Sequence, residues 1–207
     1  MFVGLVGKSC SGKNYVAKLF AKRGYQVLDL DELCHKAFEL EPIISEIEKA
    51  FGPQIINKED GTVSRKALGR IVFDNPSKRL VLENILYSWL KKEIPSLASG
   101  KVTLLNGALL RRAKLDELCS LVIYVEAPYE DRLERVLKRD KITAEDFEKR
   151  ETAQADVDFR NNKYKAPVLV LNNYKDTKEL ELIRQINIIC DRINSISQRE
   201  NENNEEE

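Results

Sequence analysis

Two glycines and a lysine near the N-terminus have the spacing of a loop that binds phosphate groups. Gly7, Gly12 and Lys13 fit the pattern G-x-x-x-x-G-K. Glycine lets successive backbone N–H groups turn toward an anion, and a helix that begins here adds the positive end of its dipole. The ammonium of Lys13 is then expected to reach the β- and γ-phosphates of a nucleotide. The motif usually closes with Ser or Thr, whose hydroxyl binds Mg²⁺, and here Asn14 is the candidate metal ligand.

The elements on both sides of this loop are those that the motif requires. Residues 2–6 form an apolar run that predicts a strand, and Val16, Leu19 and Phe20 recur at helical spacing after the loop. The alternative is a β–α turn that binds nothing, but the order of strand, loop, lysine and helix favours a nucleotide site. The residues predicted to contact the nucleotide are Gly7, Cys10, Ser11, Gly12, Lys13, Asn14 and Tyr15.

Two acids follow the second predicted strand, residues 26–29. Ligands of open α/β sheets bind at the carboxyl ends of the strands, so Asp29 and Asp31 are expected beside the phosphate loop. Asp31 is the candidate carboxylate for Mg²⁺ or for a substrate hydroxyl. Asp29 has two interpretations, a site residue or a helix N-cap. His35, the only histidine, lies one helical turn after Asp31 and is either structural or a substrate contact.

Residues 32–98 are predicted to be helical, interrupted near Gly52 and Gly61. Ser64 and Asn75 are predicted helix N-caps. Several helices between two strands exceed what a β–α–β crossover needs, so this segment is expected to be a substrate-binding insertion.

The later apolar runs predict three more strands at residues 102–105, 121–125 and 168–171, separated by helices at about 108–118 and 128–139. A last helix is expected at 177–195. Continuous apolar runs are typical of parallel strands that are covered on both faces. The alternation predicts an α/β fold with a five-stranded parallel sheet flanked by helices.

The segment at residues 140–162 is rich in charge and poor in apolar residues. Arg135 and Arg139 share a helix face, Thr143 is a predicted N-cap, and Arg150 follows. Arginines position groups and spread charge in phosphoryl transfer, so the segment is interpreted as a lid. A salt-bridged surface helix is the alternative.

The composition suits one globular domain in the cytoplasm. The 207 residues carry equal numbers of basic and acidic side chains, without a membrane span or signal peptide pattern. The four cysteines have no metal-ligand spacing and are expected to be reduced thiols. Residues 197–207 contain five glutamates and predict a disordered acidic tail. The remaining charge is too weakly basic to indicate a nucleic acid partner.

The order of these motifs resembles the dephospho-CoA kinase family of P-loop kinases. The resemblance runs from Phe2 to about Asn173. It is carried by the loop, by Val27–Leu33, by Arg65–Leu68, by Tyr124–Pro128, by Arg135 with Arg139, by Arg150 with Gln154, and by Asn172-Asn173. It implies one P-loop kinase domain at 1–196, with its core at 1–31, 99–139 and 163–196, a CoA-binding insertion at 32–98 and a lid at 140–162.

The same resemblance implies an enzyme that uses ATP and Mg²⁺ to phosphorylate the ribose 3′-hydroxyl of dephospho-CoA, the last step of coenzyme A biosynthesis. Lys13, Asp31 and Arg139 are the implied catalytic residues. Asn14 and Arg111 depart from the family pattern, and they support one alternative, a binding protein that has lost catalysis. A second alternative is a nucleoside monophosphate kinase, and the Asp29-x-Asp31 pair and the long helical insertion argue against it.

Overall fold

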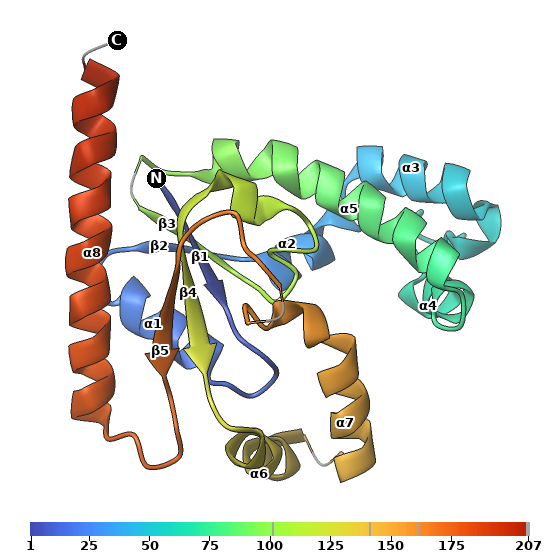
Figure 1. Cartoon of the computed structure of the whole chain (residues 1–207). Helices are drawn as coiled ribbons and strands as arrows, with labels where there is room; N and C mark the ends of the chain where they lie inside the picture. The colour runs from blue at the N-terminus through green and yellow to red at the C-terminus, as the bar shows by residue number, and fades with distance from the viewer. Residues whose placement is uncertain (101, 141, 161, 206–207) are drawn as a thin grey trace. The chain divides into compact units, whose positions relative to one another are not determined.

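The computed structural model describes residues 1–100, 102–140, 142–160 and 162–205 (Figure 1). The chain divides into two compact units. One comprises Met1–Leu28 and Ser99–Glu207, and the other comprises Asp29–Ala98. Each is described in turn.

A five-stranded sheet forms the centre of the first unit. Its strands are β1 (Phe2–Val6), β2 (Gln26–Asp29), β3 (Thr103–Asn106), β4 (Cys119–Glu126) and β5 (Val168–Asn172). The strand order is β2-β3-β1-β4-β5, and β1 pairs in parallel with both β3 and β4. The predicted parallel sheet is confirmed. All four residues of β3 are buried, as expected for a strand covered on both faces.

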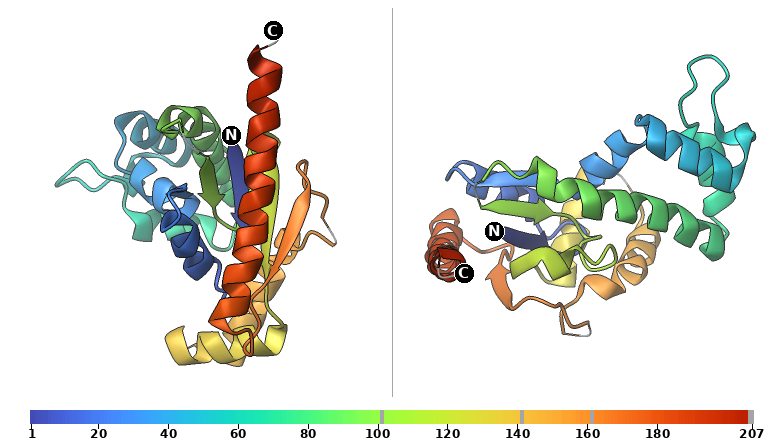
Figure 2. Two further views of the ribbon diagram at one scale, coloured as in Figure 1. Left: turned by 90° about the vertical axis from the view of Figure 1, so that its left-hand side faces the viewer. Right: turned by 90° about the horizontal axis from the view of Figure 1, so that it is seen from above.

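Helices α1 (Lys13–Ala21) and α8 (Glu179–Glu205) share one hydrophobic core with this sheet. The axis of α8 runs alongside β5 (Figures 1 and 2). The two helices contribute Val16, Leu19, Phe20, Leu182, Ile186, Ile189 and Ile193 to the core. Their spacing of three and four residues gives each helix one apolar face, which packs against the inward side chains of β1 and β4.

Two local predictions in this unit need correction. The helix expected at 108–118 is a series of turns followed by the short 3₁₀ helix η2 (Leu115–Leu118). Lys114 has a φ of 55°, which is incompatible with a continuous helix. The helix α8 continues to Glu205, where a disordered tail was expected from residue 197. No Gly or Pro interrupts it, and Ser120 donates a hydrogen bond to Glu200. Residues 206 and 207 lie outside the described part.

The segment after β4 holds α6 (Tyr129–Asp140), α7 (Ala144–Ala153) and η3 (Ala155–Val157). Thr143 caps α7, as predicted, and forms a reciprocal capping box with Asp146. Phe147 is completely buried and lies 5.3 Å from the Tyr129 ring. This segment therefore has a stronger apolar anchor than its composition suggested. Residues 141 and 161 of the predicted lid lie outside the described residues.

The second unit is helical, with α2 (Leu30–Ala37), α3 (Glu41–Phe51), η1 (Pro53–Ile55), α4 (Arg65–Val72) and α5 (Pro76–Leu97). The predicted N-caps are confirmed, because Ser64 accepts the N–H of Ala67 and Asn75 accepts that of Lys78. The helix α5 passes through Pro95 and packs against α2, α3 and α4.

Candidate nucleotide-binding site

The loop between β1 and α1 has backbone conformations that only a few residue types tolerate. Gly12 has a φ of 89°, and Cys10 also has a positive φ, of 60°. A Cβ on Gly12 would lie 2.1 Å from Nδ2 of Asn173, and a Cβ on Gly7 would lie 2.7 Å from the carbonyl oxygen of Val125. Both glycines of the motif are therefore required by the close approach of neighbouring groups, and Gly12 is required by its backbone conformation as well.

Two side chains hold the loop from its outer side. Asn173 Nδ2 donates to the Ser11 carbonyl at 2.7 Å. Arg135 donates from Nη1 to the carbonyls of Cys10 at 3.2 Å and Ser11 at 3.3 Å, and from Nη2 to the Asn173 carbonyl at 2.7 Å. In a trans peptide the N–H points opposite to the carbonyl, so the N–H of Gly12 is turned away from these anchors. An anion that binds on the side opposite to Asn173 and Arg135 can therefore accept a hydrogen bond from the Gly12 N–H. Arg135, which precedes the predicted lid in the sequence, thus fixes the loop.

The side chain of Ser11 is the clearest sign that the loop is suited to a ligand. It is 1% exposed, and its Oγ has no hydrogen-bond partner among the described residues. A buried hydroxyl without a partner carries a free-energy cost that a ligand atom can remove. The loop therefore fits a phosphate group.

Lys13, Asn14 and Asn106 form a polar cluster at the start of α1. Lys13 Nζ donates to Oδ1 of Asn106 at 2.8 Å and to Oδ1 of Asn14 at 3.0 Å, and Asn106 Nδ2 donates to Oδ1 of Asn14 at 3.2 Å. Amide oxygens are acceptable ligands for Mg²⁺, so Asn14 and Asn106 are suited to that ion. Sequence reasoning did not assign Asn106 to the site. Its position at the carboxyl end of β3, beside β1, was the available signal.

The helix α7 contacts the loop through a second cluster that the sequence did not reveal. Glu151 accepts two hydrogen bonds from Arg132 and lies 3.5 Å from Nζ of Lys8. Burial raises the pKa of Glu151, but Arg132 and Lys8 outweigh it, and the net pKa lies below its ordinary value. Next to this cluster, the Ser9 N–H donates to Oε1 of Gln154 at 2.7 Å.

Arg139 and Tyr15 have other partners in this structure. Nε and Nη2 of Arg139 lie 2.5 and 2.9 Å from the carboxylate of Asp140, which also accepts from Arg150 at 2.7 Å. These two arginines hold the pKa of Asp140 well below its usual range. The hydroxyl of Tyr15 donates to Glu179 at 3.2 Å. Both side chains must exchange these partners to contact a nucleotide.

The candidate acid lies in the second unit. Asp31 is exposed on the first turn of α2, and Asp29 Oδ1 accepts the N–H groups of Asp31 and Glu32, each at 3.1 Å. Asp29 is therefore the N-cap of α2, which supports the helix-cap interpretation of this residue. His35 is exposed, and its carbonyl accepts a hydrogen bond from Arg65.

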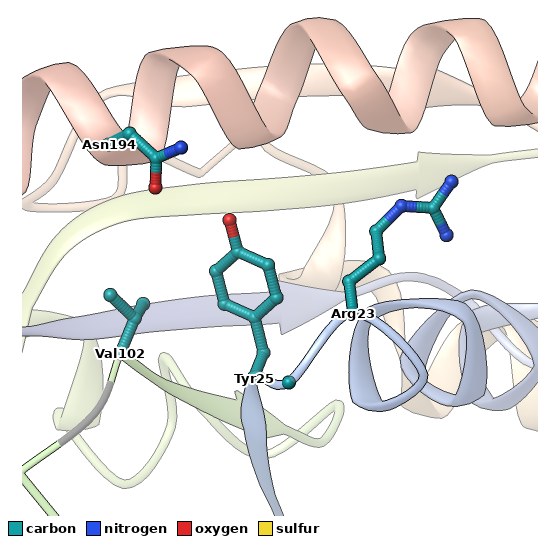
Figure 3. A pocket seen from close by; sticks show the side chains of 5 residues that line it. Arg23, Tyr25, Val102 and Asn194 are labelled. Atoms are coloured by element: carbon teal, nitrogen blue, oxygen red, sulfur yellow. The ribbon is translucent and has the colours of Figure 1, made fainter.

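A shallow hollow on the first unit is separate from the loop. Its volume is about 250 Å³, and it is lined by Arg23, Gly24, Tyr25, Val102 and Asn194 (Figure 3). Tyr25 and Val102 directly precede β2 and β3, so the hollow lies at the amino ends of these strands, opposite to the loop. It has no part in the nucleotide site.

The sheet order and the loop between β1 and α1 define an α/β protein with a P-loop kinase fold. The family model described as dephospho-CoA kinase matches residues 1–179. The chain belongs to the dephospho-CoA kinase family, and it is a phosphotransferase.

Individual relatives agree with this assignment. The chain is 32% identical to a dephospho-CoA kinase of Fusobacterium nucleatum over 196 residues, which cover 93% of this chain and 98% of the relative. A crystal structure of a Thermus thermophilus protein has a TM-score of 0.70 and 29% identity, covering 93% of this chain and 97% of the other. A dephospho-CoA kinase from Campylobacter jejuni shares the fold, with a TM-score of 0.62, 22% identity and coverage of 93% and 95%.

The described residues include no helix that is long and apolar enough to cross a membrane. They also include no cluster of three or more His, Cys, Asp or Glu side chains that is suited to a metal ion.

Proposed function

We propose that this chain transfers the γ-phosphate of ATP to the ribose 3′-hydroxyl of dephospho-CoA, in the cytoplasm, as the last step of coenzyme A biosynthesis. The observation that carries the proposal is the loop itself. Ser11 has a buried hydroxyl that finds no partner in the described part of the chain. Gly12 presents its N–H and Lys13 supplies a cation, all within a chain of the dephospho-CoA kinase family.

In the proposed reaction, the loop N–H groups and Lys13 bind the β- and γ-phosphates and orient the γ-phosphorus. Phosphoryl transfer needs little covalent chemistry from the protein, so positioning and charge stabilisation supply most of the catalysis. Asp31 is the proposed acceptor of the proton of the 3′-hydroxyl. Arg139 leaves Asp140 and stabilises charge that develops on the transferred group.

Asn14 and Asn106 are the proposed side chains that hold Mg²⁺ through their amide oxygens. When bound, this ion neutralises phosphate charge and helps to align the γ-phosphate. Residues 140–162 are the proposed lid over ATP, and the helical unit at 32–98 is proposed to bind dephospho-CoA.

The decisive experiment measures ADP formation from Mg-ATP with and without dephospho-CoA, and identifies the product by mass and by the position of its new phosphate. We expect ADP to form in equal amount with coenzyme A. Parallel reactions with AMP and CMP test the nucleoside monophosphate alternative. ATP binding without transfer to any acceptor would instead support a binding protein.

A further inference from the structure

The residue after Gly7 in the phosphate loop is a lysine that is held by long contacts. Nζ of Lys8 lies 3.5 Å from Oε2 of Glu151 and 4.0 Å from Oδ2 of Asp158, and the side chain is 21% exposed. A hydrogen bond between an ammonium and a carboxylate is ordinarily about 2.7–2.9 Å long. Lys8 is therefore attracted by two acids of the segment 140–162 without forming a close hydrogen bond with either.

Both acids are also bonded to a second cation. Nη2 of Arg132 donates to Oε2 of Glu151 at 2.7 Å, and Nη1 donates to Oε1. Asp158 Oδ1 accepts the backbone N–H of Arg160 at 3.0 Å and lies 3.4 Å from its Nη1. If Lys8 moves away, each carboxylate keeps an arginine. The cost of leaving a buried carboxylate without a cation therefore does not arise.

Arg132 and Lys8 differ in their freedom to move. Arg132 is 4% exposed and also donates to the carbonyl oxygens of Ala127 at 3.0 Å and Ser9 at 3.4 Å. Its guanidinium is thus held by the backbone as well as by Glu151. Lys8 has a flexible stem of methylene groups, and its ammonium carries three donors. Of these two cations, Lys8 is the one that can turn to a new anion.

Lys8 lies where the predicted lid meets the phosphate loop. The next residue, Ser9, bonds through its N–H to Gln154 at the end of α7. Lys8 and Lys13 each follow a glycine of the motif, so they lie at the two ends of a loop that curls around an anion. A terminal phosphate carries a charge of about −1.5 to −2 at pH 7, so the γ-phosphate is the group of ATP that attracts a second cation most strongly.

We propose that Lys8 is a further catalytic residue, which leaves Glu151 and Asp158 when ATP binds and contacts the γ-phosphate. The inference rests on the proposed nucleotide site. During transfer, the bond from the γ-phosphorus to the oxygen shared with the β-phosphate breaks. A bond to the 3′-oxygen of the acceptor forms, and the proton of that hydroxyl passes to Asp31. Lys8 takes no part in these bonds, and its ammonium stabilises the charge on the γ-phosphate oxygens.

The test compares ATP with ADP, because only ATP has the γ-phosphate. Calorimetric titrations at saturating Mg²⁺, without an acceptor, give the dissociation constant of each nucleotide. Lys8→Met keeps the length of the side chain and removes its charge. It should weaken ATP binding by about tenfold, the effect of losing one contact between charged groups, and should change ADP binding by less than about twofold. Turnover with dephospho-CoA at saturating ATP should fall by about tenfold or more.

Two variants and one measurement on the unaltered chain serve as controls. Lys8→Arg keeps the positive charge and should retain most of the preference for ATP over ADP. Lys18→Met makes the same substitution at an exposed position of α1 and should change neither dissociation constant. Brief acetylation of the unaltered chain with acetic anhydride avoids any effect of a substitution on folding. Mass spectrometry should then show that ATP protects Lys8 and ADP does not, while Lys18 reacts equally with either nucleotide.

The outcomes separate this inference from the proposed function. If Lys8→Met weakens ATP and ADP binding equally or leaves both unchanged, or if ATP protects Lys8 no better than ADP does, this inference is wrong and the nucleotide site stands. If the folded, unaltered chain binds neither ATP nor ADP, the nucleotide site is wrong and the inference is overturned with it.

Discussion

The backbone N–H of Ser9 and the side-chain oxygen of Gln154 lie 2.7 Å apart, so the end of α7 is bonded directly to the phosphate loop. Gln154 is the C-cap residue of α7, and Ser9 lies between the two glycines of the loop. When a nucleotide binds in the loop, the N–H of Ser9 is therefore already bonded to Gln154 of the predicted lid.

Gln154→Glu should weaken ATP binding by about tenfold. The new carboxylate can still accept the Ser9 N–H, but its charge repels the phosphates. Calorimetry measures the affinity, and thermal unfolding confirms that the fold is kept. Gln26→Glu is the matched control, because Gln26 Oε1 accepts the backbone N–H of Ser99 at 2.9 Å at the amino end of β2, opposite to the loop. Equal effects of both substitutions would contradict a specific role of Gln154 at the phosphates.

Lys13→Ala should weaken ATP binding by about 10- to 100-fold, the range for losing one hydrogen bond between charged groups. Turnover should fall as well, because the ammonium contacts the phosphates in both the ground state and the transition state. Calorimetry and ADP release measure the two effects. Lys18→Ala removes the same charge from an exposed position of α1 and should change neither. Unchanged ATP affinity in Lys13→Ala would exclude the loop as the nucleotide site.

Asp31→Asn should reduce turnover by about 100-fold or more, because it removes the proposed proton acceptor, and should leave ATP affinity nearly unchanged. Steady-state rates with dephospho-CoA measure the first effect, and calorimetry measures the second. Asp29→Ala provides the contrast. It removes the N-cap of α2 and should lower the free energy of unfolding by about 1 kcal/mol. Normal turnover of Asp31→Asn would rule out its role as base.

Asn14→Ser should raise turnover when Mg²⁺ is limiting and change it little when Mg²⁺ is saturating. A serine hydroxyl is more compact than the longer amide side chain, and Mg²⁺ demands near-octahedral geometry at about 2.0–2.1 Å. Replacing Mg²⁺ by Mn²⁺ in the unaltered chain is expected to raise turnover for the same reason. Coupled ADP release over a range of metal concentrations gives the result. Identical metal dependence in both proteins would exclude Asn14 as the metal ligand.

Glu151→Gln should lower the free energy of unfolding by about 3 kcal/mol at neutral pH, because it leaves the nearly buried guanidinium of Arg132 without its anion. The folded-state pKa of Glu151 lies below its ordinary value of 4.5. Its stabilisation is therefore complete above that value and is lost as the pH falls through the lower, folded-state pKa.

Urea unfolding between about pH 7 and about pH 3 tests this pH dependence. The difference between the unaltered chain and Glu151→Gln should narrow as the pH falls. Glu145→Gln, on the exposed side of α7 beside Lys149, is the control and should have little effect at any pH. A difference that stays constant over the whole range would show that the charge of Glu151 is not responsible.

Local sequence patterns predicted much of the fold. The strands were found because parallel strands covered on both faces are continuous apolar runs. The helix starts at Ser64, Asn75 and Thr143 were found because N-caps depend on residues only a few positions apart. The error at 108–118 has the same origin. Buried leucines there resemble a helical face, but they point into the core from separate turns.

The parts of the site that were missed depend on contacts between distant residues. Gln154 is 145 residues from Ser9, and Asn106 is 93 residues from Lys13. Neither pair has a local pattern, because packing of the sheet and of α7 brings them together. The loop motif itself was recognisable because all of its glycine and lysine positions fall within seven residues.

The placement of α8 has a consequence for how the first unit acquires its structure. Val3 and Leu5 of the first strand share their core with Ile186 and Ile189, which are translated last among the core elements. On the ribosome, this core holds the side chains of α1 but lacks those of α8 until α8 emerges. Contacts between such distant residues slow the search for the native arrangement. The nascent chain therefore passes through a stage in which its apolar strands are available to chaperones.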